Sequence, residues 1–477
     1  MLINKPLILS TGTGAAAAFT IDQSIRFDST ANAHMDRTPS SAGNQKTWTF
    51  SCWVKRGKLS SRQYLFTAYS GNNNNTGMNS LRFYEDDTLQ WTGYSTVWLK
   101  TNQVFRDTSA WVHIVLSVDT TDTIPSERQR IYINGERVTS FSTTNNMAYD
   151  YAYSVNDNVA HAIGIGLGNQ TSYDLDGYMA EIVLLDGTAT DCTSFAEENE
   201  NGIWIPKDVS GLTFGTNGFH IKGEDASDLG NDSSSNNNDF TTSGLASHDQ
   251  VADSPTNNFA VANPLDSSYY MGSETFSEGN LQMTLGSSVG GLATMGITSG
   301  KWYAEFEVHS GSTTYFILGI YGDQPTATTH YVGQSANSYG YYADTGQSYN
   351  NSSASSYGNS YTVSDVIGVA VDLDNNKLYF SKNGTFQNSG DPTSGASGTG
   401  AMSINPVSST GLGAYFIASS SGNSAPSSHT INYNFGQDGT FAGNVTAGGN
   451  ADGNGVGNFK YSVPSGYLAL CTKNLGS

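Results

Sequence analysis

The chain has 477 residues, of which 37% are hydrophobic and 12% aromatic, and 42 acidic against 21 basic residues give it a net charge of −21. A surface this acidic repels a phosphate backbone, and no cluster of Lys and Arg offsets the repulsion locally, so nucleic acid is not predicted as a partner. No segment approaches the length of about 18 apolar residues that a membrane-spanning helix needs, so membrane insertion is not predicted either.

The first 20 residues are apolar and rich in Gly and Ala, and Ser10–Gly14 divides their apolar run into two short pieces. Neither piece is long enough for a signal peptide. We interpret residues 1–20 as an attachment or oligomer contact. The three cysteines, Cys52, Cys192 and Cys471, are too few and too far apart for a disulfide framework or a zinc site, so buried thiols are predicted.

Residues 21–222 form the first dense region of predicted strands. In TWTFSCWVKRG the apolar side chains alternate with Thr47, Thr49 and Ser51, which is the period of a half-buried strand. The predicted inward residues are Trp48, Phe50, Cys52 and Val54. WVHIVLSVD repeats the alternation, and the dipeptide Asn134-Gly135 is a strong signal for a tight hairpin turn.

Residues 223–275 are rich in Asp, Asn and Ser, and apolar residues recur in them at intervals. We therefore predict an ordered polar connector. Residues 276–477 form the second dense region, in which GKWYAEFEV again alternates. Its predicted inward residues are Trp302, Ala304, Phe306 and Val308. No long amphipathic helix is predicted, so the fold class is all-β.

The segment DVIGVAVDLDNNKLYFSKNGTF contains Asp372, Asp374 and Asn376 at the first, third and fifth positions of a calcium-binding loop. Such a loop also needs glycine at its sixth position and a bidentate carboxylate at its twelfth. Lys377 and Asn383 stand at those positions, and a lysine opposes a cation. Metal binding is therefore not predicted here.

The same segment is typical of a β-hairpin whose two central turn residues are Asn375 and Asn376, because asparagine tolerates a positive φ. This register places Asp374 opposite Lys377 as a pair of opposite charges. It also pairs Leu373 with Leu378 and Val371 with Phe380. Five apolar residues would then share one face: Val369, Val371, Leu373, Leu378 and Phe380.

Catalytic chemistry is not predicted. Glu305 and Glu307 share one face of a strand, opposite its apolar face, so we expect them to face water rather than a cleft. Glu181 and Asp186 are five residues apart on a strand and point to opposite faces. His113 lies opposite the apolar face of its strand and is interpreted as a hydrogen-bonded sheet residue. No catalytic residue, metal ligand or cofactor is therefore assigned.

Tyrosines interleaved with Asn, Ser and Gly fill the stretch from 330 to 361. Tyrosine supplies rigid amphipathic area, and its small polar neighbours supply adaptable hydrogen bonds, which is the mixture that antibody paratopes use. The predicted ligand-binding residues are Tyr331, Tyr341, Tyr342, Asp344, Tyr349, Asn350 and Tyr357. The alternative is that these residues form ordinary strands, loops and protomer contacts.

Two families resemble parts of the chain. Residues 300–471, through GKWYAEFEV, the hairpin segment, NYNFGQ and VPSGYLALC, resemble a SPRY domain, a bent β-sandwich that binds partners through loops. Residues 24–185, through TFSCWVKRG, WVHIVLSVD, RIYINGERV and LDGYMAEIVLLDG, resemble a laminin-G-like domain of the concanavalin A type. The resemblance implies two antiparallel sandwiches joined by the connector.

The order of the two domains, with the connector between them, resembles virion proteins of tailed phages of marine bacteria. That resemblance implies a tail-fibre or other surface-exposed virion component, assembled in the host cytoplasm, that binds host glycans or proteins. It also implies other virion proteins as partners and a homo-oligomer, with a trimer as our expectation. The alternatives are a capsid-decorating or tail-associated protein without a receptor role and, less favoured, a glycan hydrolase.

Overall fold

The computed structural model describes residues 19–265, 274–286, 290–312, 314–323, 331–421 and 429–475. The chain divides into two compact units, the first ending at Asn257 and the second beginning at Asn258. The segment predicted as a connector is thus shared between the two units. The predicted attachment segment, apart from Phe19 and Thr20, lies outside the described residues.

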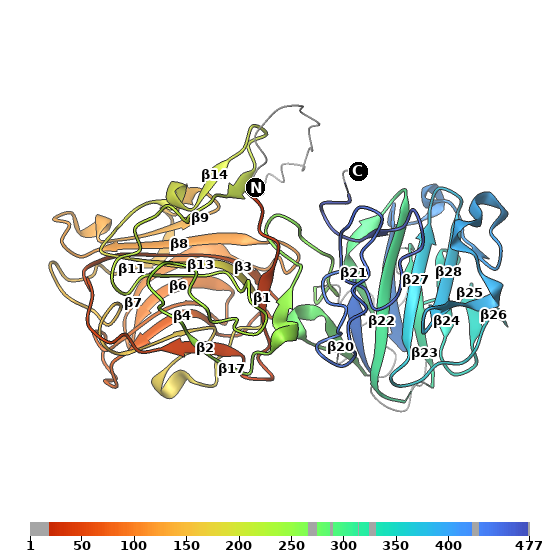
Figure 1. Ribbon diagram of the computed structural model, residues 1–477, viewed down its shortest axis with the longest axis horizontal. Coiled ribbons are helices and arrows are strands. Elements are labelled where there is room, and N and C mark those ends of the chain that lie inside the picture. Colours follow the sequence, from red (N-terminus) through yellow and green to blue (C-terminus); the bar gives the residue numbers. More distant parts are fainter. Residues whose placement is uncertain are drawn as a thin grey trace. The chain divides into compact units, whose positions relative to one another are not determined.

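Unit 1 is a sandwich of two 8-stranded antiparallel sheets, one of which carries β8 and β13 and the other β4 and β6 (Figure 1). The first sheet contains β10 (Glu136–Arg137), β9 (Gln129–Ile133), β8 (Val112–Asp119), β3 (Thr47–Arg56), β13 (Gly177–Asp186), β1 (Ser24–Phe27), β18 (Gln250–Val251) and β16 (Phe219–Ile221). The second contains β11 (Phe141–Thr144), β7 (Val97–Val104), β6 (Thr88–Gly93), β5 (Met78–Phe83), β4 (Gln63–Tyr69), β12 (Ala160–Ile163), β2 (His34–Arg37) and β17 (Thr241–Ser243).

The predicted alternation along β3 is confirmed. Trp48, Phe50, Cys52 and Val54 all lie in the core between the sheets. Trp48 meets Trp91 edge-on at 5.6 Å between ring centroids, and Phe50 stacks on Phe66 at 4.6 Å. Aromatic pairs in these geometries add stability beyond the area they bury.

The opposite face of β3 is buried as well, which the sequence analysis did not predict. Thr49 and Ser51 are at most 1% exposed, and the Thr49 hydroxyl donates to the carbonyl of Thr188 at 2.8 Å. A second apolar cluster that includes Phe195 and Phe214 covers this face. The segment that supplies Phe195 and Phe214 also contains the hairpin of β14 (Ala196–Glu198) and β15 (Trp204–Pro206).

The hairpin predicted at Asn134-Gly135 is confirmed between β9 and β10. Asn134 has a φ of 47° and Gly135 a φ of 88°. Two consecutive positive φ values are the requirement of the type I′ turn, whose twist matches that of the flanking strands.

Unit 2 is also a sandwich, with a 9-stranded and a 6-stranded sheet. The larger sheet contains β19 (Thr275–Ser277), β20 (Gln282–Leu285), β32 (His429–Asn434), β22 (Lys301–Gly311), β27 (Val366–Asp372), β28 (Lys377–Lys382), β29 (Thr385–Phe386), β30 (Met402–Ser403) and β33 (Leu468–Ala469). The smaller contains β21 (Gly290–Ile297), β31 (Tyr415–Ser421), β23 (Phe316–Tyr321), β24 (Ser338–Tyr342), β25 (Gln347–Asn350) and β26 (Ser353–Ser356).

Short 3₁₀ turns are the helical elements of the described residues. They are η1 (Pro125–Glu127), η2 (Gly168–Gln170), η3 (Cys192–Ser194), η4 (Ser247–Asp249), η5 (Glu278–Asn280), η6 (Gln387–Ser389), η7 (Pro392–Ser397) and η8 (Val407–Ser409). Within the described part of the chain, no helix is long and apolar enough to cross a membrane.

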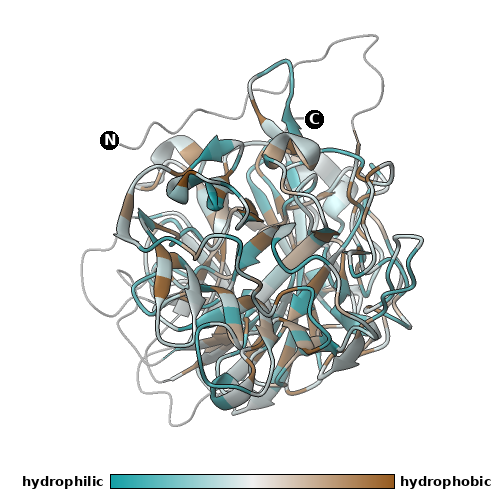
Figure 2. Cartoon of the chain, turned by 90° about the vertical axis from the view of Figure 1, so that its left-hand side faces the viewer, coloured by the Kyte–Doolittle hydropathy of each residue, from teal (hydrophilic) through white to brown (hydrophobic). Residues whose placement is uncertain are grey.

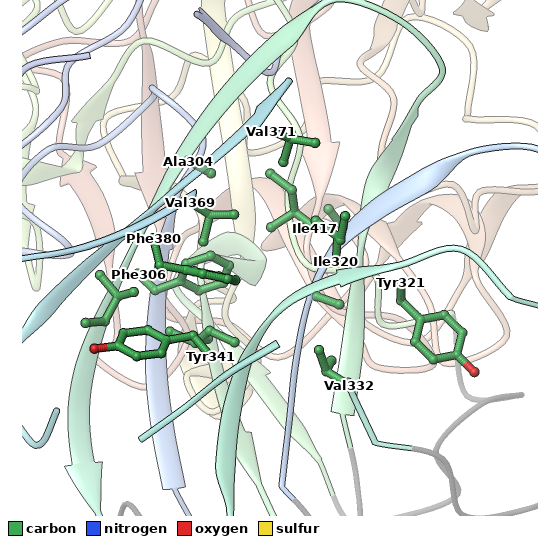
Figure 3. Close-up of a cluster of buried hydrophobic side chains, with 14 of the residues drawn as sticks. Ala304, Phe306, Ile320, Tyr321, Val332, Tyr341, Val369, Val371, Phe380 and Ile417 are labelled. Atoms are coloured by element: carbon green, nitrogen blue, oxygen red, sulfur yellow. The ribbon is translucent and has the colours of Figure 1, made fainter. Parts of the chain in front are cut away.

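The core of unit 2 is built from the alternation of its central strands (Figure 3). Ala304 and Phe306 of β22 and Val369 and Val371 of β27 face Ile417 of β31. The four residues predicted to point inward from β22 all belong to this core: Trp302, Ala304, Phe306 and Val308. Figure 2 shows hydrophobic and hydrophilic residues interspersed along both the strands and the loops.

The hairpin of β27 and β28 is confirmed, but its predicted register is wrong by two residues. Asp372, not Asp374, lies opposite Lys377. The turn is longer because the Asp372 carboxylate accepts hydrogen bonds from the backbone N–H and the side-chain amide of Asn375, at 3.0 and 2.8 Å. Lys377 instead donates to the hydroxyl of Ser403 at 3.0 Å.

The shift of two residues leaves the faces of the hairpin unchanged, because side chains alternate with a period of two. The apolar residues predicted to share one face are all in the core: Val369, Val371, Leu373, Leu378 and Phe380. Asp372 is fully buried, and Lys301 forms an ion pair with it at 3.0 Å. The carboxylate that suggested a calcium loop thus holds the turn and the neighbouring strand.

The predicted state of the cysteines is confirmed. Cys52, Cys192 and Cys471 are buried thiols and form no disulfide. Burial raises the pKa of the Cys52 thiol and raises that of Cys192 to about 11.

Candidate functional site

The tyrosine-rich stretch lies on β24, β25 and the segments next to them, in the 6-stranded sheet of unit 2. Strand alternation separates its residues onto two faces. Tyr339 and Tyr341 point into the sandwich core, whereas Tyr342 and Tyr349 are half-buried. The predicted binding residues therefore do not form one surface.

Two of the predicted binding residues are core residues. Tyr341 is 0% and Tyr357 8% exposed. The hydroxyl of Tyr357 accepts a hydrogen bond from the backbone N–H of Phe380 at 3.1 Å, and that of Tyr341 donates to the carbonyl of Asn359. Burial raises the pKa of both phenols. Both tyrosines pack in the core. Tyr341 offers no surface to a ligand, and Tyr357 offers only the small exposed part that lines the pocket described below.

Three of the predicted residues form what we call the tyrosine cluster: Tyr331, Tyr342 and Tyr349. Tyr349 lies between the other two, with ring centroids 6.3 Å from Tyr331 and 5.9 Å from Tyr342, both edge-on. All three are half-buried, and Asp344 beside them is exposed. Burial raises the pKa of Tyr342 to about 12, and the Asp344 carboxylate adds to the shift. The cluster therefore presents aromatic surface next to the exposed carboxylate of Asp344, which can accept hydrogen bonds.

The remaining predicted residue, Asn350, lines a pocket of about 350 Å³ at the open edge of the sandwich, which we call the edge pocket. Hydroxyls and amides line most of it: Tyr339, Ser348, Asn350, Ser353, Ser355, Ser356, Tyr357, Asn388, Ala401, Met402 and Ser403. The Asn350 amide donates to the carbonyl of Ser338 at 2.9 Å. Because β26 is exposed along its whole length, ligands can reach this pocket from solvent.

The serines of the edge pocket were not predicted from the sequence, although a signal for them existed. Ser348 pairs with Ser355 and Asn350 with Ser353 across the turn between β25 and β26. Asn351 and Ser352 in that turn both have positive φ. The stretch QSYNNSSASS therefore alternates as a hairpin, which places these polar side chains on one face.

The expectation that Glu305 and Glu307 face water is wrong. They share a face of β22 as predicted, but they are only 0% and 3% exposed. The Glu305 carboxylate accepts hydrogen bonds from the backbone N–H groups of Lys460 and Tyr461, both at 2.8 Å. Glu307 accepts one from the Asn432 amide at 2.8 Å.

Burial raises the pKa of Glu305 to about 7, against the effect of its hydrogen-bond donors. It also raises the pKa of Glu307. The hydroxyl of Tyr303 also donates to the Glu305 carboxyl, at 3.1 Å, so both carboxyl oxygens have partners within the protein. A substrate would have to displace these protein groups to reach the pair.

His113 is hydrogen-bonded in its sheet, as predicted. Its ring lies between the Ser51 hydroxyl at 2.9 Å and the Trp204 indole N–H at 3.1 Å, and it stacks on Trp53 at 4.8 Å between centroids. Burial lowers its pKa to about 3. Glu181 and Asp186 have separate partners, since Glu181 meets His220 at 2.7 Å and Asp186 accepts from the backbone of Asn44.

The described residues contain no candidate metal site. No group of three or more His, Cys, Asp or Glu side chains in them could hold an ion.

Comparison with known families matches the two sandwiches separately. Residues 28–192 match the concanavalin A-like lectin/glucanases superfamily. Residues 301–404 match the SPRY domain family. No curated protein matches the chain.

Solved structures that resemble parts of the chain share little sequence with it. A proposed carbohydrate-binding protein from Bacteroides ovatus ATCC 8483 is 16% identical over 47% of this chain, with a TM-score of 0.34, and the match spans 58% of that protein. A heptameric pentraxin from Limulus polyphemus is 18% identical over 36% of this chain and 78% of its own, with a TM-score of 0.29. A human SPRY domain is 19% identical over 32% of this chain and 90% of its own, with a TM-score of 0.24. The two family matches show a concanavalin A-like domain followed by a SPRY domain.

Proposed function

We propose that the protein is a surface-binding component of a bacteriophage virion, of the tail-fibre or adhesin type. It binds glycans or proteins of the host surface through the tyrosine cluster of unit 2. The observation that carries the proposal is that cluster: the ring of Tyr349 contacts those of Tyr331 and Tyr342 edge-on, with the exposed Asp344 beside them.

The chemistry of the cluster suits a sugar or a peptide. A tyrosine ring offers an apolar face on which the C–H face of a sugar can lie, and its hydroxyl offers a hydrogen bond at the rim. Asp344 supplies an acceptor for ligand hydroxyls. The edge pocket on the same sheet adds further hydroxyls and amides, and its lining carries no charged side chain. A neutral, hydroxyl-rich ligand matches both features.

A binding role also agrees with the state of the carboxylates that a glycan hydrolase would use. Glu305 and Glu307 are buried and hydrogen-bonded to groups of the protein itself. Glycoside hydrolysis needs two carboxyls that reach the substrate. We therefore propose that the protein acts without catalysis.

The virion assignment is supported by the resemblance in domain order to proteins of marine tailed phages. In this proposal the chain assembles in the host cytoplasm as a homo-oligomer and contacts other virion proteins. Labelling of intact virions with an antibody against this chain, viewed by electron microscopy, tests the assignment. Labelled tail fibres are the expected result, and unlabelled particles would overturn it.

Binding is tested with the purified full chain on host cells and on a glycan array. We expect Tyr342→Ala and Tyr349→Ala to weaken binding about tenfold each, the effect of losing one good aromatic contact at an interface. Tyr149→Ala is the matched control, because Tyr149 is a tyrosine of unit 1 that is 57% exposed. Unchanged binding by both cluster variants would contradict the adhesin role and favour a capsid-decorating or tail-associated protein.

A further inference from the structure

A row of polar side chains crosses the outer face of the second sheet of unit 1. Tyr64 on β4 lies opposite Arg82 on β5, Arg82 opposite Gln90 on β6, and Gln90 opposite Lys100 on β7. Their strand neighbours point the other way, since Leu81, Phe83, Leu89, Trp91 and Leu99 all belong to the core. Pairing across four adjacent strands therefore places these polar groups side by side on one face.

Three cations of this face converge on a single tyrosine ring. Arg62, Arg82 and Lys100 lie 4.9, 5.3 and 5.7 Å from the ring centroid of Tyr84. Arg62 also lies 4.4 Å from the ring of Tyr173. We call these five residues, together with Tyr64, the cation–tyrosine cluster. Such a gathering is notable in a chain with a net charge of −21, because like charges this close repel each other.

Carboxylates of the protein balance this charge in part. Glu85 pairs with Arg62 at 2.9 Å and Asp86 with Lys100 at 2.6 Å, and the two carboxylate side chains are 52% and 48% exposed. Arg82 forms no ion pair within the described residues. Its guanidinium donates instead to the Tyr64 hydroxyl at 2.7 Å and to the Gln90 amide oxygen at 3.1 Å.

We propose that the cation–tyrosine cluster is a second binding site, specific for saccharides that carry a carboxylate or sulfate group. The anion of the ligand binds Arg82 and Lys100, and it competes with the exposed Asp86 for the lysine. The sugar ring lies against Tyr84 and Tyr173. Arginine next to an aromatic ring suits this task, because its planar fork binds an anion while its face stays stacked. The inference rests on the proposal that the protein binds glycans, and it assigns unit 1 the acidic ones.

The experiment compares acidic and neutral polymers on the full chain by biolayer interferometry. Polygalacturonate is paired with its methyl ester, and dextran sulfate with dextran. We expect the acidic member of each pair to bind and the neutral member not to bind at this site. Binding should weaken as salt rises from about 0.05 to 0.5 M, because added ions screen a charge–charge contact at cations that are partly open to solvent.

Variants locate the site. We expect Arg82→Gln to weaken binding of the acidic polymers by about tenfold or more, and Lys100→Gln by a few-fold, as expected for the loss of hydrogen bonds to a charged group. Arg82→Lys keeps the charge but loses the fork, so it should fall between Arg82→Gln and the unaltered chain. Arg137→Gln is the control, because Arg137 on β10 is 40% exposed and pairs with Glu127 at 2.8 Å. Thermal melting checks that each variant is folded. If Arg82→Gln does not fold, Lys100→Gln provides the test of the site.

Three results would overturn the inference. One is equal binding of the acidic and neutral polymers, and another is unaltered binding by both Arg82→Gln and Lys100→Gln. The third is full competition by inorganic sulfate at the same anion concentration, which would leave an anion site without a sugar subsite. Loss of acidic-glycan binding in Tyr342→Ala alone would also overturn it and would leave the proposed function of unit 2 standing.

Discussion

The central strands of the two sandwiches, β3 and β22, bury ionisable side chains on their outer faces in different ways. Lys55 on β3 meets Asp253 at 2.7 Å, and both side chains are 0% exposed. On β22, Glu305 is satisfied by the neutral N–H groups of Lys460 and Tyr461. A buried charge needs either a counter-ion or several donors; Lys55 has the first arrangement and Glu305 the second.

The difference shows how a covered sheet face responds to change. An ion pair fails when either partner is removed, because the other charge is left buried. A carboxyl held by neutral donors can take up a proton and stay in place, so it responds to pH instead. Stability measurements on the two units can therefore separate the two arrangements.

The largest effect is expected at the ion pair of β3. Lys55→Met leaves the buried charge of Asp253 without its cation and should lower the free energy of unfolding of unit 1 by about 3–5 kcal/mol. Urea-induced unfolding of the full chain measures the loss. Lys46→Met is the control, because Lys46 and Asp150 form a pair at 2.8 Å whose side chains are 37% and 56% exposed, and it should cost about 0.5 kcal/mol or less. Equal losses in the two variants would contradict the role given to Lys55.

Unit 2 should lose stability as pH rises from about 4.5 to about 7, through Glu305. Its folded pKa is raised to about 7 from an ordinary value of 4.5, so the folded state keeps a proton that the unfolded chain has already released. The difference corresponds to roughly 3 kcal/mol. Hydrogen exchange of the β22 amides at a series of pH values measures it in unit 2. Glu305→Gln should reduce the change in the stability of unit 2 with pH. An unchanged pH dependence in that variant would assign the effect to another group.

A smaller effect of the opposite sign is expected on the outer face of the first sheet, through His113. Its folded pKa is lowered to about 3, so the unfolded chain takes up a proton first as pH falls below about 6.5. Unit 1 should therefore lose about 2 kcal/mol between pH 7 and pH 5 from this group. Hydrogen exchange of the β8 amides reports the loss, and His113→Gln should reduce it. If unit 1 were equally stable at pH 7 and pH 5 in both the unaltered protein and His113→Gln, His113 would not be the buried neutral base that its surroundings indicate.

Sequence periodicity predicts the inner faces of these sheets well, because alternation is a local property. It predicted the inward residues of β3 and β22 and the faces of the β27–β28 hairpin. The register of that hairpin could not be predicted, since it depends on Asp372 closing the turn through its side chain. Two asparagines in a row gave no sign of the longer turn.

The covering of the outer faces could not be predicted for a different reason. The donors to Glu305 come from residues more than 150 positions away in the chain, and no local pattern connects them. The tyrosine stretch was identified as a region, but Tyr357 lies outside the strands that alternation describes, and its burial depends on Phe380 of another strand. The cation–tyrosine cluster likewise forms from distant parts of the chain. Tyr64, Arg82 and Lys100 lie on β4, β5 and β7, and Arg62, Tyr84 and Tyr173 lie outside the strands.

The buried cysteines have a practical consequence for all of these measurements. Thiolates react with alkylating reagents and buried thiols do not, and Cys52 and Cys471 are both 0% exposed. Modification of Cys52 therefore requires unit 1 to open, and modification of Cys471 requires unit 2 to open. Mass spectrometry of peptides from an alkylated sample can then time the opening of each sandwich within one intact chain, without any introduced probe.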